Sequence, residues 1–178
     1  AFDERIALTI PQESGGGGTI SWRYSDMLEK RDKVEVENLL HAQGSSTNFP
    51  WYASALRQFN NAPDKLPFDH HELIGMIAPR AVLMIESSQI PRMGAEAARV
   101  DALAAREIWQ ALGVAGRMGA TEETVGHCQW HAGFTPALEA YLDKFLLGKK
   151  EVNTDILRSK YTDVDRAKWI PWTTPELK

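Results

Sequence analysis

One short stretch of the sequence, Val125 to His131 (VGHCQWH), gathers side chains that could do chemistry. It contains the only cysteine of the chain and two of its five histidines. A histidine on a loop that follows a strand can reach a nucleophile on another loop and act as its general base. The same residue types are also typical of an aromatic loop at an interface, without a catalytic role. The stretch alone leaves both interpretations open.

An acidic residue, Glu13, lies at a second place where catalytic groups often gather. Arg5 to Pro11 (RIALTIP) predicts a short buried strand, and Gly15 to Gly18 stop regular structure soon after it. Catalytic groups collect beyond the carboxyl ends of strands in open α/β sheets. A solvated acid beside a glycine turn is the alternative. The four glycines do not match a phosphate-binding loop, because no Lys-Ser or Lys-Thr follows them.

Strands and helices that could position these residues alternate along the chain. Ala81 to Glu86 (AVLMIE) predicts a second buried strand, and Arg117 to Val125 predicts a third. Amphipathic or capped helices are predicted over Phe68 to Ile77, Glu96 to Leu112 and Thr135 to Leu147. This order predicts a parallel α/β sheet.

Capping residues and histidines mark the first of these helices. Asp69 is the expected cap, with Glu72 at the third helical position as in a capping box. His70 and His71 would point about 100° apart on a helix, so they cannot easily share a metal ion. We expect both histidines to be structural.

Parallel strands would bring Glu13, the loop from Ser87 to Gly94 and His127 to one edge of the sheet. An acid that orients a histidine, which in turn activates a serine, is the logic of a hydrolase triad. No G-x-S-x-G nucleophile turn occurs in the 178 residues. A triad drawn from this chain therefore lacks its nucleophile.

Composition limits the possible functions of the chain. Its 43 % apolar residues are enough for one domain with a real core. A net charge of −4 argues against a nucleic-acid partner, and no apolar run is long enough for a membrane partner. A single cysteine excludes an internal disulfide framework and a cysteine-rich zinc site, and we expect no metal and no cofactor. The opening AFDERIALTIP is not a signal peptide, so a start within a longer chain stays open.

Several blocks of the sequence, in order, resemble the C-terminal part of a glucuronoyl esterase, a serine esterase of carbohydrate esterase family 15. These blocks are IALTIPQESGGGG, the following Trp22-Arg23, LPFDHHELIGMIAPRAVLMIE, GHCQWH, FLLG and the terminal WIPWTTP. The resemblance covers nearly the whole chain and implies part of an α/β-hydrolase, a three-layer sandwich with a mostly parallel sheet. Residues 1–148 would belong to the catalytic domain, and residues 149–178 would form a tail packed on it.

The resemblance also implies roles for individual residues. Glu13 matches the acid and His127 the base of a Ser-His-Glu triad. Cys128 matches a cysteine that bridges to another cysteine beside the nucleophile. The family's nucleophile motif, G-C-S-R-N-G-K, lies upstream of the PQESG block and is absent from this chain. An upstream segment of the same polypeptide would therefore have to supply the serine.

Sugar-binding candidates follow from the same resemblance. Glu35 or Glu37 falls near a position that binds sugar hydroxyls, and Arg92 or Met93 falls near the place of a tryptophan that contacts the sugar in fungal relatives. Many bacterial members carry the acid after the later strand. The loop SSQIPRMG has no acidic residue there, which favours Glu13 and leaves Glu86 as the alternative acid.

The activity implied is cleavage of 4-O-methyl-glucuronate esters, which link glucuronoxylan to the alcohols of lignin. The resemblance also implies a secreted protein, either extracellular or periplasmic. An acetyl-xylan esterase or another α/β-hydrolase esterase is an alternative. A non-catalytic carbohydrate-binding fragment is a further one, because the nucleophile is missing.

Overall fold

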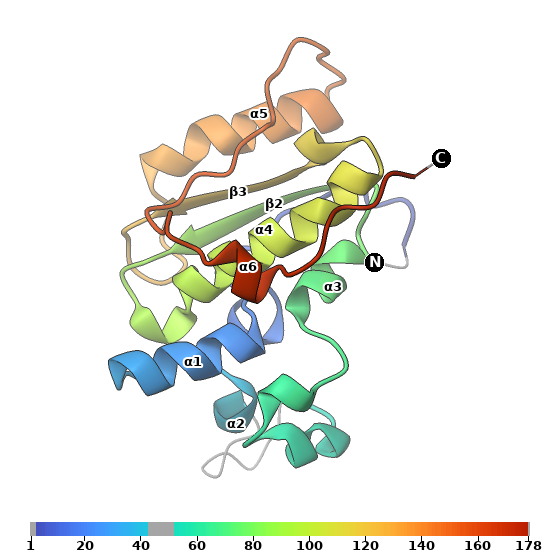
Figure 1. The fold of residues 1–178 in the computed structure, drawn as a ribbon. Coiled ribbons are helices and arrows are strands. Elements are labelled where there is room, and N and C mark those ends of the chain that lie inside the picture. Colours follow the sequence, from blue (N-terminus) through green and yellow to red (C-terminus); the bar gives the residue numbers. More distant parts are fainter. Residues whose placement is uncertain (1–2, 43–51, 178) are drawn as a thin grey trace.

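Three parallel strands form the sheet of this protein. The computed structural model describes residues 3–42 and 52–177, and within them the strand order is β1-β2-β3 (Figure 1). The strands are β1 (Leu8–Thr9), β2 (Ala81–Ser87) and β3 (Met118–Glu123). Leu8 pairs with Ala81, and Val82 pairs with Met118, so β2 lies between the other two. The predicted parallel α/β sheet is confirmed.

The first strand is shorter than the predicted Arg5 to Pro11. The amides of Arg5 and Ile6 bond to Asp3 in a local turn, so they are not available to β2. Pro11 has no amide hydrogen to donate. One further bridge, between Gln12 and Ile85, carries the chain along β2 beyond the strand.

Helices cover both faces of the sheet and produce three layers. Val82 and Met84 of β2 belong to the apolar cluster that contains α4 (Ala95–Ala111). Leu83 and Ile85 point the other way, into the cluster that contains α5 (Thr135–Phe145). Side chains alternate across a strand, so burying every residue of β2 requires a layer on each side. Figure 1 shows these two helices on opposite sides of the strands.

The predictions for these core elements differ from the structure only at their ends. The helix predicted from Glu96 to Leu112 is α4, and the helix predicted from Thr135 to Leu147 is α5. The third strand spans fewer residues than the predicted Arg117 to Val125.

Shorter elements complete the fold. The remaining α-helices are α1 (Trp22–Asp32), α2 (Leu39–Ala42), α3 (His70–Gly75) and α6 (Arg166–Trp169). The 3-10 helices are η1 (Gly15–Gly17), η2 (Ser54–Phe59), η3 (Pro63–Lys65), η4 (Pro91–Met93), η5 (Ala115–Arg117) and η6 (Ala132–Phe134). Within the described ranges, no helix combines the length and apolar character that crossing a membrane requires.

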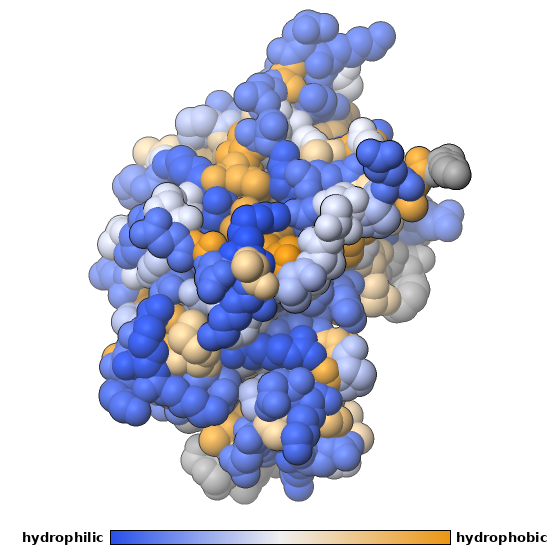
Figure 2. All heavy atoms as spheres, in the orientation of Figure 1, coloured by the Kyte–Doolittle hydropathy of each residue, from blue (hydrophilic) through white to orange (hydrophobic). Residues whose placement is uncertain are grey.

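The C-terminal tail runs along the outer edge of β3 and then across the α4 side (Figure 1). The amide of Ala120 donates to Ile156, and the amide of Arg158 donates back to Ala120. Trp169 then packs against the core and lies 4.7 Å from the ring of Tyr24. Figure 2 shows that the face crossed by the tail is mostly hydrophilic, with small apolar patches.

A single buried carboxylate, that of Asp69, caps two helices. It accepts the amide of His70 at the start of α3, as predicted, with a distance of 2.9 Å. It also accepts the amide of Trp22 at 2.9 Å and the hydroxyl of Ser21 at 2.7 Å, at the start of α1. The two amides are among the backbone groups that a helix start leaves unpaired, so one side chain fixes both helix starts. Among the described residues the Glu72 carboxylate does not accept the amide of Asp69, so the predicted capping box is not formed; this carboxylate lies 4.0 Å from His71.

Replacing Asp69 with alanine should destabilise the protein strongly. Donors at two helix starts lose a buried, charged acceptor, so we expect the free energy of unfolding to fall by about 3 kcal/mol. Urea unfolding measures this loss. The control Asp64→Ala changes an exposed acid of η3 and should cost less than about 0.5 kcal/mol. Equal losses in the two variants would contradict the shared cap.

Candidate active site

The Glu13 side chain is buried at the carboxyl end of β1. Its backbone amide donates to the carbonyl of Ile85 in β2 at 2.9 Å. Its φ angle is +44°, so the chain turns sharply at this residue and enters η1. Only 1 % of the Glu13 side chain is exposed. The strand end thus holds the carboxylate inside the fold instead of releasing it into solvent.

The loop that follows β3 brings two donors to this carboxylate. Nδ1 of His127 lies 2.8 Å from one oxygen of Glu13, and the backbone amide of Cys128 donates to the other oxygen at 2.8 Å. The His127 side chain is 51 % exposed. A proton on Nδ1 shared with Glu13 leaves Nε2 as the basic nitrogen of the ring. The geometry is that of an oriented general base.

Contacts between β2 and β3 hold the start of this loop. The hydroxyl of Ser87 donates to the carbonyl of Val125 and accepts its amide at 3.3 Å. The amide of Ser88 donates to the carbonyl of Glu123 at 3.0 Å. These bonds extend the pairing of the two strands past their ends, two residues before His127. The loop that carries His127 is therefore fixed to the central strand β2.

The three sugar-binding candidates lie together beside the glycine turn. Arg92 contacts Glu35 at 3.2 Å, and its carbonyl accepts the amide of Glu37 at 2.8 Å. The carboxylate of Glu37 accepts the amide of Gly16 at 2.9 Å. A side chain at Gly15 would collide with this carboxylate, and Gly15 also has a φ angle of +57°. Glycine is thus required there for the turn after Glu13 to pack against Glu37.

Cys128 is exposed and has a free thiol. Its sulfur lies 3.6 Å from Nε2 of His127, and its φ angle is +54°. The left-handed backbone at this position directs the amide toward Glu13 while the thiol stays at the surface. The bond from this amide to Glu13 was not predicted from the sequence, because it depends on the loop backbone and not on the cysteine side chain.

A second acid, Glu86, is buried near the end of β2. Neither of its carboxylate oxygens has a hydrogen-bond partner of good geometry among the described residues. Burial raises the pKa of Glu86 to about 8; the charges of Glu13 and Glu122 add to this, and the hydroxyl of Thr19 opposes it. Glu86 is therefore mostly protonated, and so mostly uncharged, at pH 7. Glu13, not Glu86, lies against His127.

Two groups of side chains in the described part of the chain are close enough to share a metal ion. They are Glu13 with His127 and Cys128, and Asp69 with His70 and Asp101. Protein donors already engage both oxygens of Glu13 and both oxygens of Asp69. Metal binding at either group would have to displace these bonds, so a site without metal stays our prediction.

Comparisons with known proteins give a consistent result. Residues 1–113 match the family model described as glucuronyl esterase, fungi. Over 99 % of its length the chain is 38 % identical to a 4-O-methyl-glucuronoyl methylesterase of Hypocrea jecorina, and 37 % identical to one of Phanerochaete carnosa. It covers 37 % and 44 % of these two proteins. The chain thus spans less than half the length of these relatives.

Solved structures show the same fold. The glucuronoyl esterase catalytic domain of Hypocrea jecorina superposes with a TM-score of 0.90 at 37 % identity, over 99 % of this chain and 47 % of that one. A mutant glucuronoyl esterase of Sporotrichum thermophile, in complex with methyl 4-O-methyl-β-D-glucopyranuronate, gives a TM-score of 0.88 at 32 % identity. This superposition also covers 99 % of this chain and 47 % of that one.

The buried acid Glu86 should make stability depend on pH. Its pKa is raised from 4.5 to about 8. Between these pH values the folded state keeps a proton that the unfolded state has lost, so the free energy of unfolding falls as pH rises. Glu86→Gln cannot lose a proton. Its stability relative to the parent protein should therefore increase between about pH 5 and pH 8, by on the order of 4 kcal/mol at most.

Urea unfolding at both pH values measures this difference. Glu139→Gln, an exposed change on α5, serves as the control and should show a difference that does not vary with pH. A pH-independent difference for Glu86→Gln would contradict the neutral state of this acid.

Proposed function

The chain belongs to the fungal glucuronyl esterase family, and on that premise we propose that it supplies the acid and the base of a serine-type carboxylic ester hydrolase. The 2.8 Å contact between Glu13 and Nδ1 of His127 carries this proposal. The proposed substrate is an ester of 4-O-methyl-glucuronic acid that links glucuronoxylan to a lignin alcohol. A related structure holds methyl 4-O-methyl-β-D-glucopyranuronate, which supports this class of substrate. The serine comes from an upstream segment of the same polypeptide.

The proposed reaction proceeds by acyl transfer in two steps. Nε2 of His127 takes the proton of the serine hydroxyl while the serine oxygen attacks the ester carbonyl. Glu13 holds the imidazole through Nδ1 and stabilises its cation. The imidazolium then gives its proton to the departing alcohol. In the second step Nε2 of His127 takes a proton from water while the water oxygen attacks the acyl carbon. The proton then passes to the serine oxygen as the uronic acid leaves.

The neighbouring residues have proposed roles in the same site. Glu35, Glu37 and Arg92 bind the sugar, since they lie together beside the turn that follows Glu13. Cys128 forms a disulfide with a cysteine beside the nucleophile, and its exposed thiol is accessible for this bond. A disulfide and a polymeric extracellular substrate both fit a secreted protein.

Substitution of the proposed acid and base tests the function in the full polypeptide. His127→Ala removes the general base and should lower kcat/KM on benzyl glucuronate about 10⁴-fold or more, and Glu13→Gln should lower it about 10³- to 10⁴-fold. Glu139→Gln, exposed on α5, should leave kcat/KM unchanged. Faster cleavage of a simple acetate ester than of benzyl glucuronate would favour an acetyl esterase and contradict the proposed substrate.

The proposed disulfide has its own test. Peptide mass analysis of the full polypeptide without reduction should show the peptide of Cys128 joined to the peptide that carries the nucleophile. Reduction should then release both peptides. A free Cys128 thiol in the oxidised protein would overturn this pairing.

A further inference from the structure

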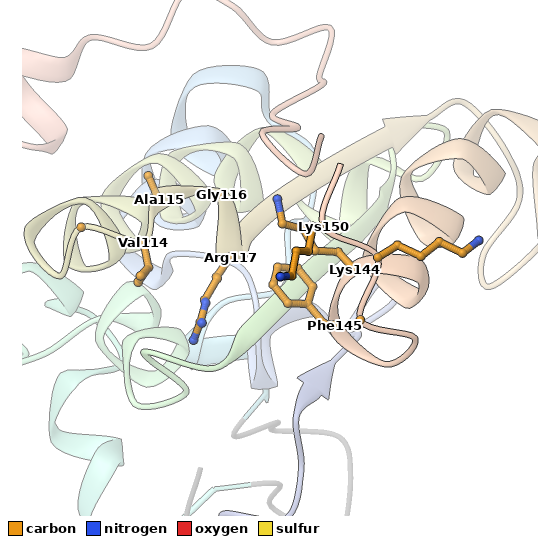
Figure 3. A pocket seen from close by; sticks show the side chains of 10 residues that line it. Val114, Ala115, Gly116, Arg117, Lys144, Phe145 and Lys150 are labelled. Atoms are coloured by element: carbon orange, nitrogen blue, oxygen red, sulfur yellow. The ribbon is translucent and has the colours of Figure 1, made fainter. Parts of the chain in front are cut away.

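A cavity of about 460 Å³ lies at the end of the sheet opposite to Glu13 and His127. One wall is the turn after α4, from Gly113 to Arg117, which leads into the amino end of β3. The other wall comes from the end of α5 and the residues after it, including Lys144, Phe145 and Lys150 (Figure 3). Nothing in the proposed ester cleavage uses this cavity.

The cavity is positively charged although the chain as a whole has a net charge of −4. The cationic residues of its lining are Arg117, Lys144, Lys149 and Lys150, and no acidic residue of the described ranges lines it. Asp143 offsets the charge of Lys149 through an ion pair of 2.9 Å. Glu151 follows Lys150 in the chain but is not part of the lining. A clear excess of positive charge remains.

Two of the cationic side chains are held in place by neutral groups. Arg117 donates to the carbonyl of Pro79 at 3.1 Å, and Lys144 donates to the carbonyl of Val152 at 2.8 Å. A neutral carbonyl leaves their charge uncompensated. The Arg117 side chain is therefore positioned in advance, which lowers the entropy lost when an anion binds, whereas the Lys144 side chain extends away from Arg117 and Phe145 (Figure 3).

Basic residues often follow helix ends because they complement the helix dipole, and both α4 and α5 end here. At α4 this role is already filled by backbone groups. The amides of Leu112, Gly113 and Val114 donate to carbonyls of the last turns of that helix. Capping of α4 thus gives no reason for Arg117 to line the cavity.

An aromatic ring gives the cavity a second property. Phe145 is half-buried at the end of α5 and lies across the cavity from Arg117 (Figure 3). A guanidinium binds a carboxylate through paired hydrogen bonds, and an aromatic face packs against the apolar side of a sugar ring. We propose that this cavity binds a uronic-acid side group of a xylan chain, at a second, non-catalytic site.

This inference rests on the proposed function and deepens it, since it names another contact with the same polymer. Helix α5 begins soon after the His127 loop and ends at the cavity. Its 11 residues span about 16 Å, which is the approximate separation of the two sites. A polymer can reach both, whereas a single esterified sugar cannot.

Binding of soluble glucuronoxylan to the full polypeptide tests the site. The double variant Arg117→Gln/Lys150→Gln should bind about fivefold more weakly at low salt, because two exposed charges are lost. The control Lys33→Gln/Lys65→Gln removes the same charge at exposed positions outside the cavity and should bind like the parent protein. If the double variant does not fold, the single variant Lys150→Gln replaces it in the test and should show a smaller loss of affinity.

Other polymers and a small ester complete the design. Xylan stripped of its uronic acids should bind the parent more weakly than glucuronoxylan binds the double variant, because it loses the contacts of both sites, and polygalacturonate should bind less tightly than glucuronoxylan. Equal binding of all polymers, or equal affinity of the double variant and its control, would overturn the site. Cleavage of benzyl glucuronate should be unchanged in the double variant, so loss of this site and failure of the proposed esterase activity are distinguishable.

Discussion

The Glu13 carboxylate joins two loops that the sheet alone would only bring near one another. One of its oxygens takes the imidazole of His127 and the other takes the amide of Cys128. A buried carboxylate is costly unless its oxygens are hydrogen-bonded, so both loops must adopt the conformations that deliver these donors. Both Glu13 and Cys128 have left-handed backbone angles. The interaction thus decides the shape of each loop, not only the direction of one ring.

Pairing with the central strand β2 fixes the positions of these two loops relative to each other along the strand direction. β2 pairs with β1 through Leu8 and Thr9 and with β3 from Val82 to Ser87. A slip of one residue in either pairing would move a strand end by about 3.3 Å and turn its side chains to the other face. The 2.8 Å contact between Glu13 and His127 could not survive such a slip. Packing of α4 and α5 on the two faces of β2 therefore also protects the geometry of the site.

Local patterns predicted the framework well, and contacts between distant backbone segments were harder to foresee. The apolar run of β2, the stripe of α4 and the cap at Asp69 are each encoded in a few neighbouring residues. The shortness of β1 depends on a turn at Asp3, and the edge position of Leu157 beside Ala120 depends on backbone pairing without a sequence pattern. The pairing of Glu13 with His127 was predicted from the strand ends and the family resemblance. The lack of hydrogen-bond partners of good geometry for the Glu86 carboxylate among the described residues depends on its three-dimensional surroundings and was not predicted.

The double cap at Asp69 has a consequence for how such chains can diverge. Ser21 and Asp69 are 48 positions apart, yet their side chains are hydrogen-bonded, so the start of α1 and the start of α3 are fixed to one point. Between these two helix starts, Val36 still belongs to the main core, whereas residues 52–68 pack in a separate apolar cluster with Trp22 and Leu39. Insertions or deletions near η2 and η3 can therefore change this region without shifting the turn that carries Glu13, because this turn contacts Glu37 instead. New surface can thus be added near η2 and η3 while the acid keeps its place.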